Sequence, residues 1–298
     1  MDEQTYAIDP EDPAEMARLT TQDSLVTQGM GGLLPEWRDH NGDERLPPCP
    51  RTPRTPYHVL DVGCGPGSWV LDMAFAFPSI DVAGIDISKI MINYANARAQ
   101  TQNLTNASFG IMNVLNPLDF SENTFDLVNM RFATGFLRRE AWPKVLDELF
   151  RVTTQGGYVR VTELDTYGVT TSPALEKLLH AMYLALHKAG YGFSPDGSTL
   201  GLTPVLPRLL SELGCCEIQS MSHALDFSVG TALHASQIEN YAVFFLMIKP
   251  MLLKQQQVTL EEFENLYGQM LLETKQDDFC GVWYLRTVWG KKPLSYSR

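Results

Sequence analysis

The sequence contains little positive charge. Its 298 residues include 23 Lys and Arg against 35 Asp and Glu, which gives a formal net charge of −12. Nucleic-acid binding requires a basic patch that neutralises phosphates, and anionic membrane surfaces attract basic segments. The charge balance therefore argues against a nucleic-acid partner and against a membrane partner.

Long apolar runs and paired cysteines are also absent. The longest wholly apolar run, Tyr241 to Ile248, has eight residues, whereas a membrane-spanning helix needs about 20. The acidic N-terminus is not followed by the apolar stretch of a secretory signal. The five cysteines include no CxxC pair, which favours reduced thiols and argues against a zinc ribbon. We expect a cytoplasmic protein without a metal site.

Proline is concentrated in residues 35–56, which contain six prolines and little apolar periodicity. Proline removes a backbone donor and restricts the residue before it, so this stretch is predicted to be a linker. The preceding stretch, Asp12 to Leu34, has a loose apolar face, and Pro13 suits the first turn of a helix. Residues 1–56 are therefore predicted to form a helical arm and a proline-rich linker.

From residue 57 onward, short apolar segments alternate with helical patterns. This alternation predicts βαβ units, a mostly parallel sheet and helices on both of its faces. Together with two later strands, it predicts a doubly wound α/β fold with seven strands. The strands are expected at 58–62, 81–87, 107–112, 125–130, 157–163, about 217–227 and 282–289, with helices at 68–77, 88–100 and 142–150.

Helical patterns dominate the second half of the chain, at 172–189, 204–213, 232–253 and 259–274. Thr259 and Glu262 have the spacing of a capping box. We expect the long helices to cap the carboxyl ends of the strands, where open α/β sheets bind ligands. The predicted organisation is a core at 57–168, a cap or substrate region at 169–279 interleaved with the strand at about 217–227, and a closing strand and tail at 280–298.

A glycine-rich turn follows the first predicted strand and opens a helix. It is Asp61-Val62-Gly63-Cys64-Gly65-Pro66-Gly67. Glycines at alternate positions allow a tight turn and let backbone amides approach a ligand, and the helix N-terminus adds positive potential. Asp86 ends the second strand, where a carboxylate can accept hydrogen bonds from both hydroxyls of a ribose. The pattern predicts a site for a cofactor that contains a ribose.

Two cofactors fit this arrangement, and the glycine spacing distinguishes them. The dinucleotide fingerprint is G-x-G-x-x-G, followed by an acid about 20 residues on. Here the glycines are spaced G-x-G-x-G, and Ser68 occupies the place of the third dinucleotide glycine. Asp61 lies outside that fingerprint and suits a ligand with an amino group. The pattern therefore disfavours a nicotinamide oxidoreductase.

Val59 to Gly67 resembles the first motif of the class I S-adenosylmethionine-dependent methyltransferases, and Asp86 matches the ribose-binding acid of that superfamily. Asn116 to Val128 resembles the stretch that leads into the fourth strand. Gly281 to Pro293 resembles the end of the seventh strand in the small-molecule branch. The resemblance implies a Rossmann-like fold with a helical cap, S-adenosyl-L-methionine as cofactor and S-adenosyl-L-homocysteine as product.

The resemblance also implies roles for individual residues. Asp61 and the glycine loop would hold the amino-acid portion of the cofactor, Asp86 the ribose hydroxyls, and Ile87 the adenine. Asn113 stands where the superfamily often has an acid for the adenine amino group, and its amide oxygen still accepts a hydrogen bond. The implied cofactor residues are Asp61, Gly63, Cys64, Gly65, Gly67, Asp86, Ile87, Asn113, Val114, Asn129, Met130 and Arg131, of which the last three would border the methyl group.

Methyl transfer from a sulfonium is a direct displacement, so the protein mainly supplies alignment and desolvation. A base is needed only when the acceptor carries a proton, and Glu163, Asp165 or a histidine would suit that role. The N-terminal helix would close over the cofactor, with Gln22, Gln28 and Tyr6 as candidate contacts. The candidate catalytic residues are Glu163, His180 and His223, and the candidate substrate residues are Tyr6, Tyr183, Tyr241 and Trp283, although aromatic residues at helical spacing also suit a core.

The sequence thus predicts a methyltransferase that acts on a small, partly apolar metabolite, as a monomer or a homodimer. Two alternatives stay open on the same fold. One is a cofactor-binding regulator similar to those of fungal secondary metabolism. The other is an enzyme that uses the positive charge of the cofactor for a cyclisation or rearrangement.

Overall fold

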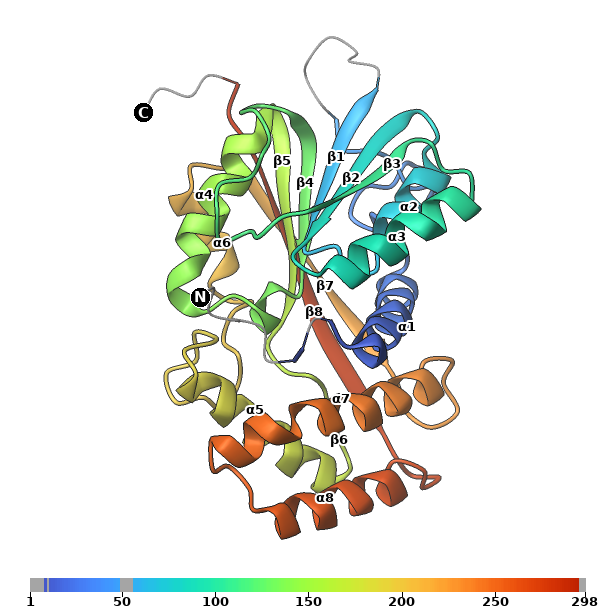
Figure 1. The fold of residues 1–298 in the computed structure, drawn as a ribbon, viewed down its shortest axis with the longest axis vertical. Helices are drawn as coiled ribbons and strands as arrows, with labels where there is room; N and C mark the ends of the chain where they lie inside the picture. The colour runs from blue at the N-terminus through green and yellow to red at the C-terminus, as the bar shows by residue number, and fades with distance from the viewer. Residues whose placement is uncertain (1–7, 10, 49–55, 295–298) are drawn as a thin grey trace.

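The computed structural model describes residues 8–9, 11–48 and 56–294. Figure 1 shows a central sheet with helices on both faces and a second group of helices beyond one end of the sheet. Within the described residues, no helix is both long and apolar enough to span a membrane.

The sheet is mostly parallel, as predicted. Strands β1 to β5 run parallel to one another, and β8 is antiparallel to its neighbours β5, β6 and β7. The order is β3-β2-β1-β4-β5-β8-β6, and β7 also pairs with β8. The two-residue strand β6 is an addition to the seven predicted strands. The strands are β1 (Tyr57–Val62), β2 (Ile80–Asp86), β3 (Ala107–Ile111), β4 (Phe125–Arg131), β5 (Thr153–Leu164), β6 (Val169–Thr170), β7 (Cys216–Asp226) and β8 (Gly281–Lys291).

The helices begin where the sequence supplies caps. The side chains of Asp12, Ser88 and Thr259 accept hydrogen bonds from the first turns of α1, α3 and α8. Helix α1 ends at Met30, four residues before its predicted end, because Gly31 adopts a left-handed φ of 93° and caps it. The helices are α1 (Pro13–Met30), α2 (Ser68–Ala76), α3 (Lys89–Thr101), α4 (Trp142–Val152), α5 (Pro173–Lys188), α6 (Leu206–Glu212), α7 (His234–Lys254) and α8 (Leu260–Glu273), with short 3₁₀ helices at Ala133–Gly135 and Arg139–Ala141.

The alternation of side chains along β1 builds a core on each face of the sheet. Val59 packs in one apolar cluster with Trp69 of α2. Leu60 and Val62 pack in a second cluster with Leu149 of α4 and with residues of α6. The sheet is therefore doubly wound, with its apolar strands buried between two layers of helices.

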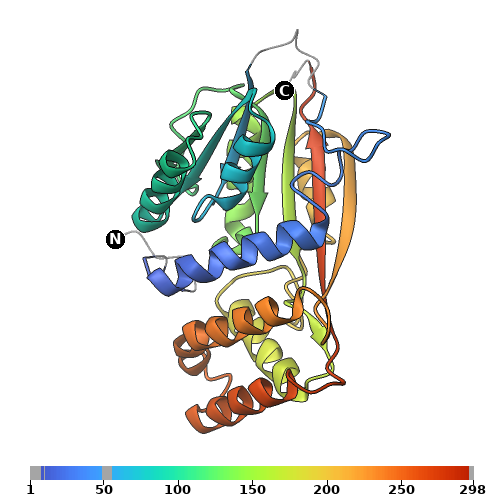
Figure 2. The same ribbon diagram turned by 90° about the vertical axis from the view of Figure 1, so that its right-hand side faces the viewer.

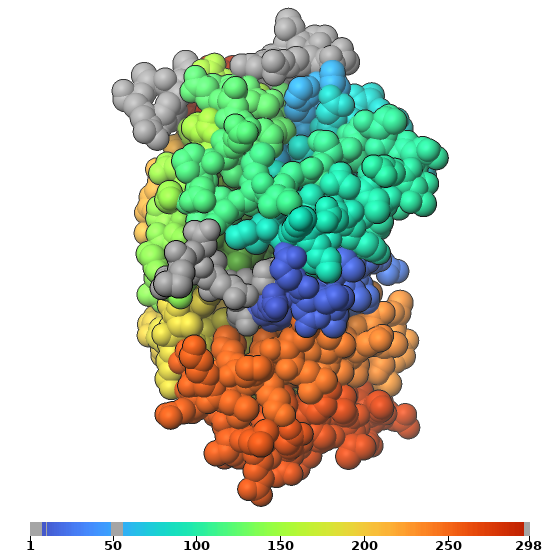
Figure 3. All heavy atoms as spheres, viewed as in Figure 1, coloured from blue at the N-terminus to red at the C-terminus, as the bar shows by residue number. Residues whose placement is uncertain are grey.

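Helices α5, α7 and α8 pack on one another and form the group that we call the cap. Helix α1 contacts α7 of the cap, α2 and β7. Figure 2 shows α1 crossing the molecule between the sheet and the cap. In the space-filling view, α1 lies on the right-hand side between the teal residues of the core and the orange residues of the cap (Figure 3). Helix α1 thus lies where the two parts meet.

The segment after α1 is anchored on the sheet by a buried ion pair. Glu36 binds Arg160 of β5, and both side chains are 0% exposed. Trp37 packs edge-on against Tyr158 and Trp289, with ring centroids 5.6 Å away in each case. Part of the predicted linker is therefore held against the core by specific contacts.

Removing one partner of the buried pair is expected to destabilise the fold. Glu36→Ala leaves the Arg160 guanidinium without its carboxylate, so the free energy of unfolding should fall by about 3 kcal/mol. Equilibrium unfolding in urea measures this change. The control is Glu212→Ala, which removes an exposed partner of Arg208 and should cost less than about 1 kcal/mol. Equal losses in the two variants would contradict the role of the buried pair.

Candidate functional site

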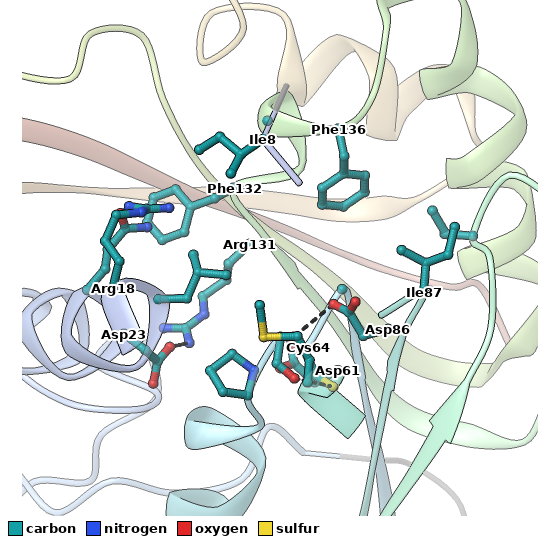
Figure 4. Close-up of a pocket in the computed structure, with 18 of the residues that line it drawn as sticks. Ile8, Arg18, Asp23, Asp61, Cys64, Asp86, Ile87, Arg131, Phe132 and Phe136 are labelled. Carbon is teal, nitrogen blue, oxygen red and sulfur yellow. Dashed lines mark hydrogen bonds and ion pairs between the residues drawn. The ribbon is translucent and has the colours of Figure 1, made fainter. Parts of the chain in front are cut away.

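A cavity of about 350 Å³ lies where the core, α1 and the cap meet. Residues at the carboxyl ends of β1, β2 and β4 and in the segments that follow β1, β2 and β3 line its core side, and residues of α1, α5 and α7 line most of its cap side. Figure 4 shows side chains from both sides pointing toward one space. The core side includes Asp61, Gly63, Cys64, Gly65, Asp86, Ile87, Asn113, Val114, Leu115, Arg131 and Phe136, together with Asp23 of α1, and the cap side includes Arg18, Leu19, Gln22, Phe132, Tyr167, Met182, Leu186, Phe244, Ile248 and Met251.

Left-handed backbone conformations explain the glycines of the turn. The φ angles of Gly63, Gly65 and Gly67 are +69°, +52° and +76°, and residues with a Cβ rarely adopt such values. Gly65 lines the cavity, and the nearest atom to an added Cβ would be Leu19 Cδ1 at 3.8 Å. A Cβ on Gly67 would come within 2.5 Å of the Phe109 ring. Gly65 thus keeps the backbone open to the cavity, whereas Gly67 permits packing behind it and does not line the cavity.

Asp86 fixes the glycine turn and retains acceptor capacity. Its two carboxylate oxygens accept from the backbone N–H groups of Gly65 and Ser88, each at 2.9 Å. Burial raises the pKa of Asp86, and these N–H donors oppose that rise. Each oxygen of a carboxylate can accept about two hydrogen bonds. Asp86 can therefore accept further donors from a ligand in the cavity.

Asp61 heads a buried chain of polar contacts. Its Oδ1 accepts from Asn129 Nδ2 at 2.7 Å, and Asn129 Oδ1 accepts from Arg160 Nη1 at 2.7 Å. Arg160 in turn binds Glu36. Burial raises the pKa of Asp61 to about 7, although the Arg131 guanidinium opposes this rise. A carboxylate in this environment favours a cation as its next partner.

A second carboxylate reaches this region from α1. Asp23 Oδ1 binds Arg131 at the end of β4, as Figure 4 shows. Asp23 Oδ2 is buried and has no hydrogen-bond partner among the described residues. Arg131 also donates to Thr27 Oγ1 at 3.3 Å and lies over the Trp69 ring. Helix α1 therefore forms part of the cavity wall and also contributes a negative charge to the core side.

The charge of Arg18 on the cap side is already paired. Its Nε and Nη2 donate to the two oxygens of Glu15 at 2.6 and 2.7 Å. Its Nη1 donates to Gln22 Oε1 at 2.6 Å and to Asn240 Oδ1 at 3.0 Å. The guanidinium thus ties α1 to α7. The remaining cap-side lining is largely apolar or aromatic.

Three residues predicted to be catalytic do not line the cavity. His180 is exposed on α5. His223 is buried in β7, and its Nε2 has no partner among the described residues. Glu163 lies within β5, which continues to Leu164, and its carboxylate accepts from the backbone N–H and the hydroxyl of Thr134. The three side chains thus lie outside the set of residues that line the cavity, and their catalytic role stays a prediction.

Three of the predicted substrate residues, Tyr183, Tyr241 and Trp283, contact a lining residue and do not line the cavity themselves. Tyr183 Oη accepts from the Tyr167 N–H at 2.7 Å, and the Tyr241 hydroxyl donates to the Tyr167 carbonyl. The rings of Phe244 and Trp283 stack with the Tyr167 ring, at centroid distances of 5.3 and 6.3 Å. The sequence interpretation missed Tyr167, although its place in the short segment after β5 was a usable signal.

Of the other predicted contacts, some line the cavity and others do not. Gln22 lines the cavity, whereas Gln28 is exposed and does not. Asn129 lies behind Asp61, and Met130 is buried in the core. β4 continues to Arg131, so only that last residue reaches the cavity. Tyr6 lies outside the described residues.

Known proteins are similar to this chain mainly over the core. A family described as "Methyltransferase domain" matches residues 59–157. The secondary metabolism regulator LAE1 of Cochliobolus heterostrophus is 29% identical over 40% of this chain and 36% of its own length. A demethylmenaquinone methyltransferase of Geobacillus sp. is 36% identical over 34% of this chain and 42% of its own. Methyltransferase str2 of Strobilurus tenacellus is 25% identical over 55% of this chain and 57% of its own. The chain thus matches less than two thirds of the length of these relatives.

The buried Glu163 gives a prediction about stability and pH. Burial raises its pKa from 4.5 to about 8, so the folded state keeps a proton that the unfolded chain releases. The associated stability is present below the unfolded pKa and is lost as the pH rises towards 8. Between about pH 5.5 and 7.5, the free energy of unfolding of wild type should therefore fall by about 1 kcal/mol per pH unit relative to that of Glu163→Gln.

Urea unfolding of both proteins across this pH range measures the difference. Gln keeps one acceptor for the Thr134 N–H and can donate to its hydroxyl, so the variant should fold. Glu261→Gln, which changes an exposed residue of α8, serves as the matched control and should follow wild type. Parallel curves for wild type and Glu163→Gln would show that Glu163 does not hold this proton.

Proposed function

We propose that this chain, which matches a family described as "Methyltransferase domain" over residues 59–157, is a class I S-adenosylmethionine-dependent methyltransferase that transfers a methyl group to a small, largely apolar acceptor. The observation that carries the proposal is the position of Asp61, the glycine turn and Asp86 around one cavity with an apolar cap side.

The core side of the cavity fits the groups of this cofactor. Asp61 offers a buried carboxylate to an ammonium group, and Asp86 offers acceptors to the ribose hydroxyls. Ile87 is 53% exposed and lines the cavity, so an adenine ring would cover an apolar side chain that is open to solvent. The amide oxygen of Asn113 accepts from the Leu115 N–H at 3.0 Å and retains a second lone pair for the adenine amino group.

When bound, the cofactor supplies a methyl group activated by its sulfonium. The residues of the chain then align that group with the acceptor and keep water away from both. The described lining residues include no histidine, lysine or glutamate. We therefore propose that transfer does not use a general base of those types, and that the acceptor releases any proton to solvent water before it enters the cavity or after the methylated product leaves it.

The cap side supports an uncharged, apolar acceptor. Phe132, Phe244 and Ile248 line it, and Tyr167 adds a ring held by the stacked Trp283. Arg18 is neutralised by Glu15, so a charged acceptor would be buried without a new partner. Burial of an unpaired charge is strongly unfavourable.

A regulator that binds the cofactor without methyl transfer is the second candidate. The similarity to the secondary metabolism regulator LAE1 over 40% of the chain favours it. A cyclisation or rearrangement on the same fold would likewise leave the methyl group in place. Turnover of the cofactor separates these functions from methyl transfer.

Label transfer tests the proposed function. Purified protein is incubated with methyl-labelled S-adenosylmethionine and fractionated metabolite extracts, and labelled products are found by mass spectrometry. We expect a labelled product from an apolar fraction, formed in equal amount with S-adenosylhomocysteine. Asp86→Ala should lose at least about tenfold in S-adenosylhomocysteine affinity, because the ribose loses its charged acceptor.

The outcomes separate the candidates. Calorimetric binding of S-adenosylhomocysteine without a labelled product in any fraction would favour the regulator or the non-methylating enzyme. Absence of binding by wild type would contradict all of these functions.

A further inference from the structure

The charges at the junction of α1 and β4 do not balance. Asp23 and Asp61 both line the core side of the cavity, and Arg131 lines it between them in Figure 4. Arg160, the next guanidinium, is committed to Glu36 and Asn129. Two carboxylates therefore share one cation at this end of the cavity.

The hydrogen bonds show the same imbalance. Arg131 binds only Oδ1 of Asp23, and the buried Oδ2 has no partner among the described residues. Asp61 accepts from the neutral amide of Asn129 at 2.7 Å. The negative charge of Asp23 is one of the causes that raise the pKa of Asp61. A single cation placed between the two carboxylates would satisfy both.

We infer that Asp23 of α1 binds the cofactor directly: the ammonium group of its amino-acid end lies between Asp23 and Asp61, and Arg131 receives its carboxylate. This inference rests on the proposed function, because it concerns the same ligand. The ligand end carries one positive and one negative charge, so it can divide the Asp23–Arg131 ion pair without leaving either partner buried and unpaired.

The position of Asp23 connects the two halves of the cavity. Asp23 lies on the same helix as Arg18, Leu19 and Gln22, which line the cap side. Arg18 joins that helix to Asn240 of α7 at 3.0 Å. A ligand held by Asp23 would therefore fix α1 and with it the wall of the acceptor half. The cofactor is expected to bind before the acceptor.

Two probes isolate the ammonium group in a calorimetric test. One is S-adenosylhomocysteine, and the other is its desamino analogue, in which hydrogen replaces the amino group. Both probes keep the adenosine and the carboxylate. If a substitution at Asp23 frees Arg131 to bind the carboxylate more tightly, the affinities of both probes therefore increase equally. Wild type should prefer S-adenosylhomocysteine, and Asp23→Asn should reduce this preference about tenfold, because it loses a charge-assisted hydrogen bond.

Asp72→Asn is the matched control. Asp72 of α2 interacts electrostatically with Asp23 and Arg131 but is exposed and does not line the cavity. The control should change the preference by less than about twofold, because exposed charges act weakly at a distance. An unchanged preference in Asp23→Asn, or an equal loss in Asp72→Asn, would overturn the inference. Binding of neither probe by wild type would overturn the proposed function as well.

Discussion

The Asp61 carboxylate lies out of water near the carboxyl end of β1, and the surrounding polar groups are arranged around it. A buried charge is unfavourable unless it is paired and hydrogen-bonded. The amide of Asn129 links Asp61 to Arg160, and Glu36 neutralises Arg160. Because the positive charge of Arg160 is neutralised by Glu36, Asp61 can still bind a cation. The ion pair between Glu36 and Arg160 also holds the segment after α1 on the sheet.

The division of the cavity follows from this arrangement. The core side collects carboxylates, backbone donors and one guanidinium, whereas the cap side pairs its only lining guanidinium among the described residues, Arg18, within the protein. Such a cavity suits a ligand with a charged end joined to groups that enter an apolar space. Helix α1 belongs to both sides, through Asp23 and Arg18, so it is the element best placed to couple them.

Local sequence signals predicted the parts of the fold that depend on neighbouring residues. The glycine turn with Asp61 and Asp86, the alternating strands and the capping box of Thr259 and Glu262 are predicted from short stretches. The contribution of Asp23 was not predicted, because its partner Arg131 is 108 residues away. The hydrogen bonds of the Tyr183 and Tyr241 hydroxyls with the backbone of Tyr167 also depend on the tertiary structure, and the role of these two residues in substrate binding stays a prediction.

The most direct test of this account is the number of protons released when S-adenosylhomocysteine binds, measured by calorimetry in buffers of different ionisation enthalpy. With a pKa of about 7 in the free protein, Asp61 is about nine-tenths protonated near pH 6 and about one-tenth protonated near pH 8. An ammonium partner should ionise it, so binding should release close to one proton near pH 6, little near pH 8, and correspondingly fewer in Asp61→Asn. Equal proton release by wild type and Asp61→Asn near pH 6 would show that Asp61 does not receive the positive charge of the ligand.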